Sequence, residues 1–424
     1  MTPPPAPARA AAPAAAGVIF AATAFIAPPL AVLAPLGLAP LLAVAAVALV
    51  VAGTGQTLAA MRPYADFATL FLVISLWAAL SALWSPIPFH SLFEALRFLA
   101  IAAAGLVVLG SAASLGEAAA GRSLRALLAG LALAILLLQV ELRSGEIIAH
   151  WLSDTPPAAP LPIQRYDRGV TVLVLLALPG ASYLSAQRQW LGLAVLALAA
   201  AATIIAFSSH TSILALAAAL IVGAVAWRWP RFVAVCLTLG TLLIATVFPL
   251  LAPGGAAIES IRRALPTLPP SAIHRLAIWR FTSDRIAERP VIGWGMDSSR
   301  AIPGGTLPVT HYFPQIQLTP FAQAMPLHPH DAALQWRLEL GLPGVALLIV
   351  LLGIVLWRLT PRSIAAWRRA LLFAYAAAAL TVALLSFGAW QAWWISLVWL
   401  GAALQMTGIR HQGSETRARL TPDP

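Results

Sequence analysis

Long runs of apolar residues recur along this 424-residue chain, and they constrain its fold more than any other feature. A hydrocarbon core about 30 Å thick is crossed by a helix of roughly 20 apolar residues. Backbone polar groups in lipid must be paired internally, which an α-helix achieves within one segment. Hydrophobic residues make up 60% of the chain and charged residues only 10%. The sequence therefore predicts an all-α, polytopic transmembrane bundle.

The apolar runs divide the chain into about twelve predicted spans. The first pair lies in 17–53, broken near Pro28, Pro29 and Pro35, and the other spans are 66–84, 94–112, 123–141, 169–186, 190–207, 210–227, 231–252, 331–357, 367–386 and 388–408. The predicted organisation is a tail (1–16), a membrane region of about nine helices (17–252), a large partly helical loop (253–330), a membrane region of about three helices (331–408) and a second tail (409–424).

Arginine placement predicts the orientation in the membrane. All 26 basic residues are arginine, and short cytoplasmic loops are where positive charge collects. With the N-terminus inside, the arginines of the short loops face the cytoplasm, while the opposite turns WSPIPFHS and FSSH carry none. Residues 142–168 and 253–330 are then extracytoplasmic. The long loop also holds arginines, but loops beyond about 60 residues cross the membrane regardless of charge.

A helix is predicted inside the long loop, in SAIHRLAIWRFTSDRIAERP, between Pro270 and Pro290. At 100° per residue it carries apolar groups on both sides, with Ile273 and Ala277 on one and Trp279 and Ile286 on the other. We expect it to be wedged between the membrane helices and the rest of the loop.

The stretch MPLHPHDAALQWRLELGLPG, residues 325–344, sets His328 and His330 where the loop re-enters the membrane. Placing an imidazole in such water-poor surroundings costs free energy unless it has a hydrogen-bonding partner or a functional role. Both histidines are therefore functional candidates. The single cysteine, Cys236, excludes a cysteine-based metal cluster. Two histidines alone do not complete a metal site, and we expect no metal here. We assign no role to the other loop histidines, which include His90.

Three stretches resemble the O-antigen ligase and polymerase superfamily. RLAIWRFTSDRIAERPVIGWG is similar to its R-x-x-x-W…P-x-x-G-x-G pattern, and HPHDAALQWRLELGLPG to its H-N-x-x-L…E-x-G-x-x-G pattern. ALSALWSPIPFHSLFEALR resembles the turn found near the N-terminus of these proteins. The resemblance covers residues 66–345 approximately, and the order of the three stretches makes it specific.

The resemblance implies a metal-independent membrane glycosyltransferase of the bacterial inner membrane, acting at its periplasmic face. A glycan would pass from a polyprenyl diphosphate carrier to an acceptor hydroxyl, on lipid A core or on another surface glycan. His330 resembles the general base of the family. Asp331 stands where the family has asparagine, so either Asp331 orients His330 and raises its pKa, or His328 shares the role.

Arginines suit the leaving diphosphate because their planar fork matches phosphate oxygens. The resemblance points to Arg275 and to either Arg165 or Arg168, and we favour Arg168 because it lies at the mouth of a span. Arg280 is a further candidate for binding the diphosphate, and the alternative is that it only faces solvent. Glu339 has a supporting role, paired with an arginine such as Arg337 or with the loop. In FSSHTS, His210 replaces the arginine common in the family, and no role is carried over to it.

Two alternatives remain open. A polymerase of the same superfamily would use a growing glycan as acceptor, and a transporter or flippase would move a lipid-linked glycan. Transporters show repeated halves and ionisable residues at mid-membrane. Here the charges lie at span ends and in the long loop, which favours the enzyme. We expect no cofactor and no nucleic-acid partner, and the partners to be the lipid-linked donor, the glycan acceptor and the bilayer.

Overall fold

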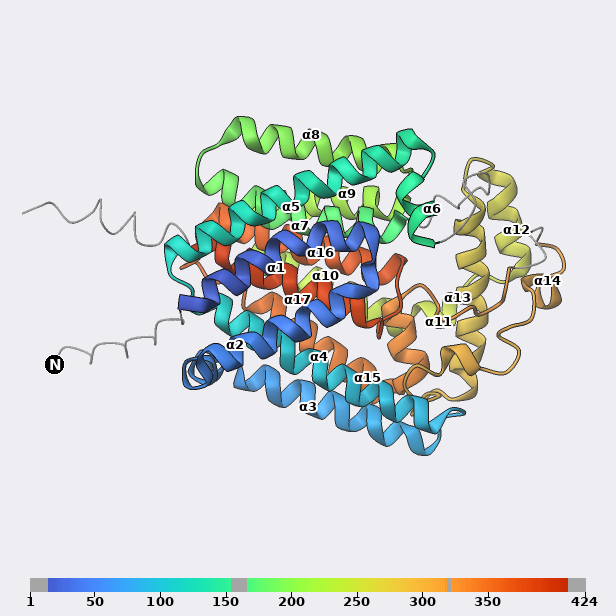
Figure 1. The fold of residues 1–424 in the computed structure, drawn as a ribbon. Coiled ribbons are helices and arrows are strands. Elements are labelled where there is room, and N and C mark those ends of the chain that lie inside the picture. The colour runs from blue at the N-terminus through green and yellow to red at the C-terminus, as the bar shows by residue number, and fades with distance from the viewer. Residues whose placement is uncertain (1–13, 154–165, 317, 319–321, 411–424) are drawn as a thin grey trace, which may run out of the picture.

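The computed structural model describes residues 14–153, 166–316, 318 and 322–410 (Figure 1). These residues form helices and no β-strand, with one isolated bridge between Pro308 and Gln323. The helices are α1 (Ala14–Leu33), α2 (Leu38–Met61), α3 (Ala65–Leu80), α4 (Pro88–Ser114), α5 (Glu117–Ser144), α6 (Ile147–Ser153), α7 (Asp167–Ala186), α8 (Trp190–Ala206), α9 (His210–Arg228), α10 (Pro230–Thr246), α11 (Phe248–Leu251), α12 (Gly255–Ala264), α13 (Pro270–Glu288), α14 (Val309–Tyr312), α15 (Ala332–Trp357), α16 (Ala366–Leu385) and α17 (Ala392–Arg410).

The long helices form one bundle, which confirms the predicted polytopic helical fold (Figure 1). Helix α1 packs against α5, α9 against α16, α4 against α2 and α17, and α10 against α15. Within the described residues, 8 helical segments are long and apolar enough to cross a membrane. One of these, Pro35–Leu83, contains both α2 and α3. The apolar helices α8, α10 and α17 are shorter. The number of spans that cross a membrane stays a prediction.

The predicted break between the first two helices is confirmed near Pro35, whereas the break predicted near Pro28 and Pro29 is wrong. Pro28 and Pro29 lie inside α1, the chain leaves the α-helix at Ala34–Gly37 before α2, and α2 is itself kinked at Gly53. A buried helix tolerates proline when neighbouring helices cover the freed backbone groups. Helix α5 supplies such cover, because Gly130 lies against the backbone of Phe25, where a Cβ would clash.

Helices α12, α13 and α14 gather at one end of the bundle, which we call the loop end (Figure 1). The predicted loop helix is confirmed as α13, which runs from Pro270 to Glu288. Its Ile278 and Phe281 pack with Leu334 and Leu338 of α15. Its other side packs inside the loop, where Ile273 and Ala277 meet Ile258 of α12 and Val309 of α14. The helix is thus wedged between the bundle and the rest of the loop.

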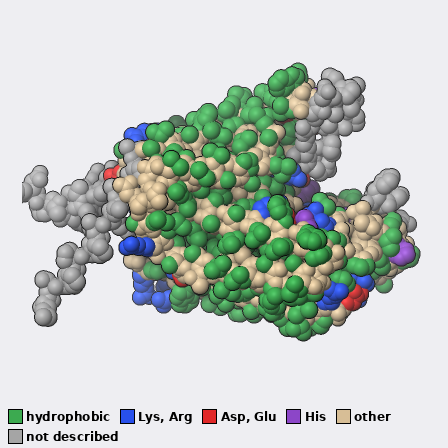
Figure 2. Space-filling view, turned by 60° about the horizontal axis from the view of Figure 1, so that its bottom comes forward, with side chains coloured by type: hydrophobic (Ala, Val, Ile, Leu, Met, Phe, Trp, Pro, Cys, Tyr) green, Lys and Arg blue, Asp and Glu red, His purple; other side chains and the backbone are tan. Residues whose placement is uncertain are grey.

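The surface of the bundle is mostly apolar, as Figure 2 shows in green. On the face shown, arginine and histidine side chains gather in a recess at the loop end. Further arginines lie at the opposite end of the bundle. Charged groups therefore concentrate at the two ends, and the recess at the loop end is where a polar site can form.

Candidate active site

A kink in α15 creates the joint on which the site is built. Gly341 has a positive φ of 65°, and Pro343 has no N–H to donate to the carbonyl of Glu339 one turn earlier. The freed carbonyls are used by the loop: Trp294 N–H donates to Leu338 O at 2.9 Å, and Gly295 N–H to Glu339 O at 2.8 Å. The LELGLPG motif is therefore a docking edge for the loop residues PVIGWG.

The WSPIPFHS turn closes the same joint from the other side. Ser91 Oγ donates to the carbonyl of Met296 at 2.6 Å, and Met296 N–H donates to Ser81 Oγ at 2.9 Å. Gly295, with a φ of 101°, lies so close to Ser85 that a Cβ would clash. The three stretches that carry the family resemblance thus meet in space.

Glu339 is the buried centre of this joint, with a relative exposure of 0%. Its carboxylate accepts hydrogen bonds from the N–H of Asp297 at 2.6 Å, from the N–H and hydroxyl of Ser299, from Nε2 of Gln335 at 3.1 Å and from Nε1 of Trp390 at 2.5 Å. The prediction that Glu339 pairs with the loop matches these contacts. Arg337 does not reach it and donates instead to the carbonyl of Pro290.

His330 is held in one tautomer. Its Nδ1 lies 2.6 Å from the carbonyl oxygen of Ser386, which can only accept, so Nδ1 carries the proton and Nε2 keeps its lone pair. The residue has a positive φ of 57°, a strained conformation for a non-glycine residue. Burial lowers the pKa of His330 to about 4, although the Ser386 carbonyl acts in the opposite direction. The ring is therefore a neutral base near pH 7.

His328 supports His330 rather than duplicating it. Its Nδ1 accepts a 3.2 Å hydrogen bond from the N–H of His330, and its Nε2 lies 3.3 Å from Nε2 of Gln391. The ring packs on Gly388, where an added Cβ would come within 3.0 Å of it. Burial lowers the pKa of His328 to about 3. A neutral imidazole has one lone pair, and His328 uses it at Nδ1 to accept from His330, so no lone pair is left for a substrate.

Asp331 does not orient the imidazole of His330, which corrects one of the two predicted roles. Its carboxylate caps α15 by accepting a 2.9 Å hydrogen bond from the N–H of Leu334. Burial raises the pKa of Asp331 to about 7. The pKa of His330 is lowered, not raised as that role required.

The charge of Arg275 acts on both histidines, although that of Arg300 acts more strongly on His328. The positive charge of Arg275 contributes to the lowered pKa of His328 and of His330. Among the residues that the structure describes, no hydrogen-bonding or ion-pair partner holds its guanidinium. Burial lowers the pKa of Arg275, and the charge of Asp167 at the start of α7 opposes this shift. An unpaired, half-buried guanidinium next to a neutral base can receive an anionic group.

Arg168 is connected to the same place through aromatic packing. It lies in the first turn of α7, and its Cζ is 5.7 Å from the ring centroid of Trp393. Trp393 Nε1 donates to Oε1 of Gln391 at 3.0 Å, and Gln391 is the neighbour of His328. The alternative candidate, Arg165, lies outside the described residues.

Arg280 does not share these properties, and its predicted diphosphate role is not supported. Its Nη2 lies 2.7 Å from Oδ1 of Asp284, and its Nη1 donates to the carbonyl of Ala252 at 3.2 Å. Five residues after Arg275, it projects from a different side of α13. The charge of Arg280 is therefore neutralised by Asp284.

His90, to which the sequence analysis assigns no role, belongs to a polar cluster beside this site. His90, Glu94 and Asp297 bring potential ligand atoms within 4.8 Å of one another. The only sequence signal was the spacing of His90 and Glu94, which puts both on one helix face. Asp297 arrives from the long loop, and nothing in the sequence indicates that pairing.

Part of this chain is similar to known proteins. Residues 193–349 match the family described as O-antigen ligase. This part of the chain is thus similar to the O-antigen ligase family. The matched range contains Arg275, both histidines and the kinked α15, whereas Arg168 and the WSPIPFHS turn lie before it.

The chain is also similar to curated rickettsial proteins. A protein of Rickettsia conorii named "Putative polysaccharide ligase" is 32% identical over 166 residues, or 39% of this chain and 38% of the relative. Proteins of the same name from Rickettsia prowazekii and Rickettsia typhi are 30% and 32% identical over 171 residues, or 40% of each chain. The match thus spans about two fifths of each relative. The apolar helices indicate an integral membrane protein.

Proposed function

We propose that this chain is a glycosyltransferase that moves a glycan from a polyprenyl diphosphate carrier to an acceptor hydroxyl. The reaction would take place at the periplasmic face of the bacterial inner membrane, with the loop end outside. The acceptor is lipid A core or another surface glycan. The observation that carries the proposal is the free Nε2 of His330 beside the unpaired guanidinium of Arg275.

In the proposed reaction, Nε2 of His330 accepts the proton of the acceptor hydroxyl. The acceptor oxygen forms a bond to the anomeric carbon, and the bond from that carbon to the carrier diphosphate breaks. The departing diphosphate takes the electron pair, and its negative charge is stabilised by Arg275 and Arg168. No metal is required, because the guanidinium groups supply the positive charge.

The hydrogen bond to Ser386 favours this use of His330 over the opposite tautomer. A proton fixed on Nδ1 leaves Nε2 as the acceptor, so the ring is ready for an acceptor hydroxyl. When Nε2 is protonated, the positive ring lies near Arg275, which promotes release of the proton.

The test is transfer by purified full-length protein in lipid nanodiscs, given a polyprenyl diphosphate-linked glycan and a rough lipopolysaccharide acceptor. Wild type should make the conjugate, and His330→Ala should lose about 10²- to 10⁴-fold in turnover while binding the donor. His311→Ala on α14 is the control, because this histidine is exposed and its ring meets that of Tyr312 edge to face. Equal turnover in both variants would contradict the proposed base.

The polymerase alternative uses the same chemistry with a second lipid-linked glycan as acceptor. Replacing the acceptor in the same assay separates the two: a ladder of longer lipid-linked glycans identifies a polymerase. Transport is less favoured because the base and the unpaired arginine lie at the loop end, not midway along the bundle.

A further inference from the structure

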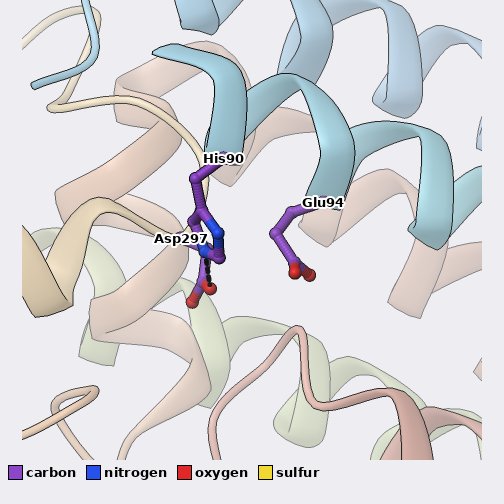
Figure 3. A group of neighbouring side chains, drawn as sticks. All are labelled: His90, Glu94 and Asp297. Carbon is purple, nitrogen blue, oxygen red and sulfur yellow. Dashed lines mark hydrogen bonds and ion pairs between the residues drawn. The ribbon is translucent and has the colours of Figure 1, made fainter. Parts of the chain in front are cut away.

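His90, Glu94 and Asp297 form a polar cluster, which we call the α4 cluster together with Arg97 and Arg300. Figure 3 shows the imidazole of His90 on the carboxylate of Asp297, with the carboxylate of Glu94 beside them. His90 Nε2 and Asp297 Oδ2 are 2.8 Å apart. Asp297 comes from the loop and has a positive φ of 51°, so the loop backbone is bent to bring its carboxylate here. The proposed reaction does not use this cluster.

Each carboxylate of the α4 cluster already faces a guanidinium. Arg97 forms an ion pair with Glu94, and Arg300 Nη2 lies 2.8 Å from Oδ2 of Asp297. Two negative and two positive side chains therefore balance before His90 is counted. A divalent cation would have to displace both arginines, and an anion would meet both carboxylates. The charge balance instead suits a neutral polar ligand.

The exposure of these side chains shows which groups can meet a ligand. The carboxyl side chains of Glu94 and Asp297 are only 3% and 8% exposed, whereas those of His90, Arg97 and Arg300 are 34%, 36% and 41% exposed. The carboxylates form the base of the cluster and orient the donors above them. Oε2 of Glu94 is the oxygen that pairs with Arg97, so a ligand meets this cluster mainly through the more exposed His90, Arg97 and Arg300.

We propose that the α4 cluster is the subsite that binds the acceptor glycan. Sugar hydroxyls donate and accept at once, so one hydroxyl can donate to Glu94 while it accepts from Arg97, and another can bridge Asp297 and Arg300. This inference rests on the proposed function, because it assigns the α4 side to the acceptor and the α7 and α13 side to the donor diphosphate.

The position of the cluster fits that division. The charge of Arg300 contributes to the lowered pKa of His328, so the cluster borders the histidine pair. Arg97 Nη2 also donates to the carbonyl of Trp390 at 3.2 Å, in the segment that precedes α17 and reaches Gln391. The charge of Asp167 acts on Arg275, which links the proposed donor side to α7. The proposed base then lies between the two substrates, as transfer between them requires.

The test measures kinetics with acceptor varied at saturating donor in nanodiscs. Glu94→Gln and His90→Gln should each raise the KM for acceptor about 10-fold or more, with kcat within about threefold, because each removes a hydrogen bond that involves a charged or polarised group. The affinity for a non-hydrolysable lipid diphosphate should not change. Glu259→Gln on α12 is the matched control, since Glu259 pairs with Arg262 and Arg263 outside the cluster.

The outcomes separate this inference from the proposed function. If wild type transfers glycan but both variants keep the wild-type KM for acceptor, the acceptor subsite is wrong and the proposed function stands. If wild type is inactive with every acceptor, the proposed function itself fails. His90→Gln keeps the test valid should Glu94→Gln unfold, because His90 is partly exposed. Chelator-sensitive activity that one metal restores in wild type and not in His90→Gln would overturn the subsite in favour of a metal site.

Discussion

The backbone N–H of Asp297 donates a 2.6 Å hydrogen bond to Oε2 of Glu339, and this bond joins the long loop to helix α15. The residues are 42 apart in the chain. The same carboxylate also accepts from Trp390, which precedes α17. One buried side chain therefore sets the position of the loop, of the α4 cluster and of the segment beside His328.

Replacing Glu339 should destabilise the protein strongly. Glu339→Ala leaves several buried donors without an acceptor, and each costs about 1 to 3 kcal/mol in the free energy of unfolding. Glu339→Gln keeps one acceptor oxygen and should cost less. Thermal unfolding in detergent micelles measures the difference. Glu288→Ala is the control, since Glu288 is 43% exposed and pairs only with Arg285 in the described structure. Similar unfolding of both alanine variants would show that the Glu339 joint is not critical.

Lysine should replace Arg275 and Arg168 poorly. An ammonium group cannot donate two parallel hydrogen bonds to a diphosphate, so Arg275→Lys and Arg168→Lys should weaken donor binding about 10-fold or more. Titration with a labelled lipid diphosphate in nanodiscs measures this affinity. Arg280→Lys is the comparison, because Arg280 is paired with Asp284. Donor affinity that falls only in Arg280→Lys would reverse our assignment.

Activity should persist in mild acid. The pKa of His330 is lowered from 6.5 to about 4, so the neutral base is present above that pH and is lost as the pH falls through about 4. We expect kcat/KM to decline near pH 4 rather than near pH 6.5. An acid limb centred near 6.5 would indicate that His330 is not the titrating base.

The same shifts predict a loss of stability in acid. His328 and His330 bind protons less readily in the folded chain than in the unfolded chain, where their pKa is near 6.5. Their contribution to stability is therefore complete above about pH 6.5 and declines as the pH falls towards the folded values. Unfolding must be followed at each pH of the rate profile, so that lost turnover is not mistaken for lost fold.

Transfer should survive excess chelator, because Arg275 and Arg168 neutralise the leaving diphosphate in the proposed reaction. Purified protein is treated with EDTA, dialysed and assayed with the lipid-linked donor. Undiminished turnover is expected. Loss of turnover that a single divalent metal restores would argue against the arginine mechanism and would direct attention to His90, Glu94 and Asp297.

Orientation can be measured with reporter fusions. Alkaline phosphatase inserted near Thr267 should be active, since the loop is predicted to lie in the periplasm, and a fluorescent reporter at the C-terminus should report the cytoplasm. An inactive phosphatase at Thr267 would place the proposed active site on the wrong side for a periplasmic transfer.

The apolar runs and the placement of arginine were sufficient to predict the helical membrane bundle. Length and hydropathy are local properties, and a lipid environment leaves few other folds for such segments. Helix α13 was predictable for the same reason, because prolines bound it and its apolar periodicity is local. The resemblance also directed attention to His330 and Arg275 before their surroundings were known.

Only the tertiary structure decided how these side chains are used. It distinguished the free Nε2 of His330 from the engaged nitrogens of His328, and the unpaired Arg275 from Arg280, which sits against Asp284. It also brought Asp297 to His90 across 207 residues. These differences depend on which groups meet after the kinked α15 and the loop dock together. Such long-range contacts follow from packing in three dimensions. The spacing of residues along one helix does not predict them.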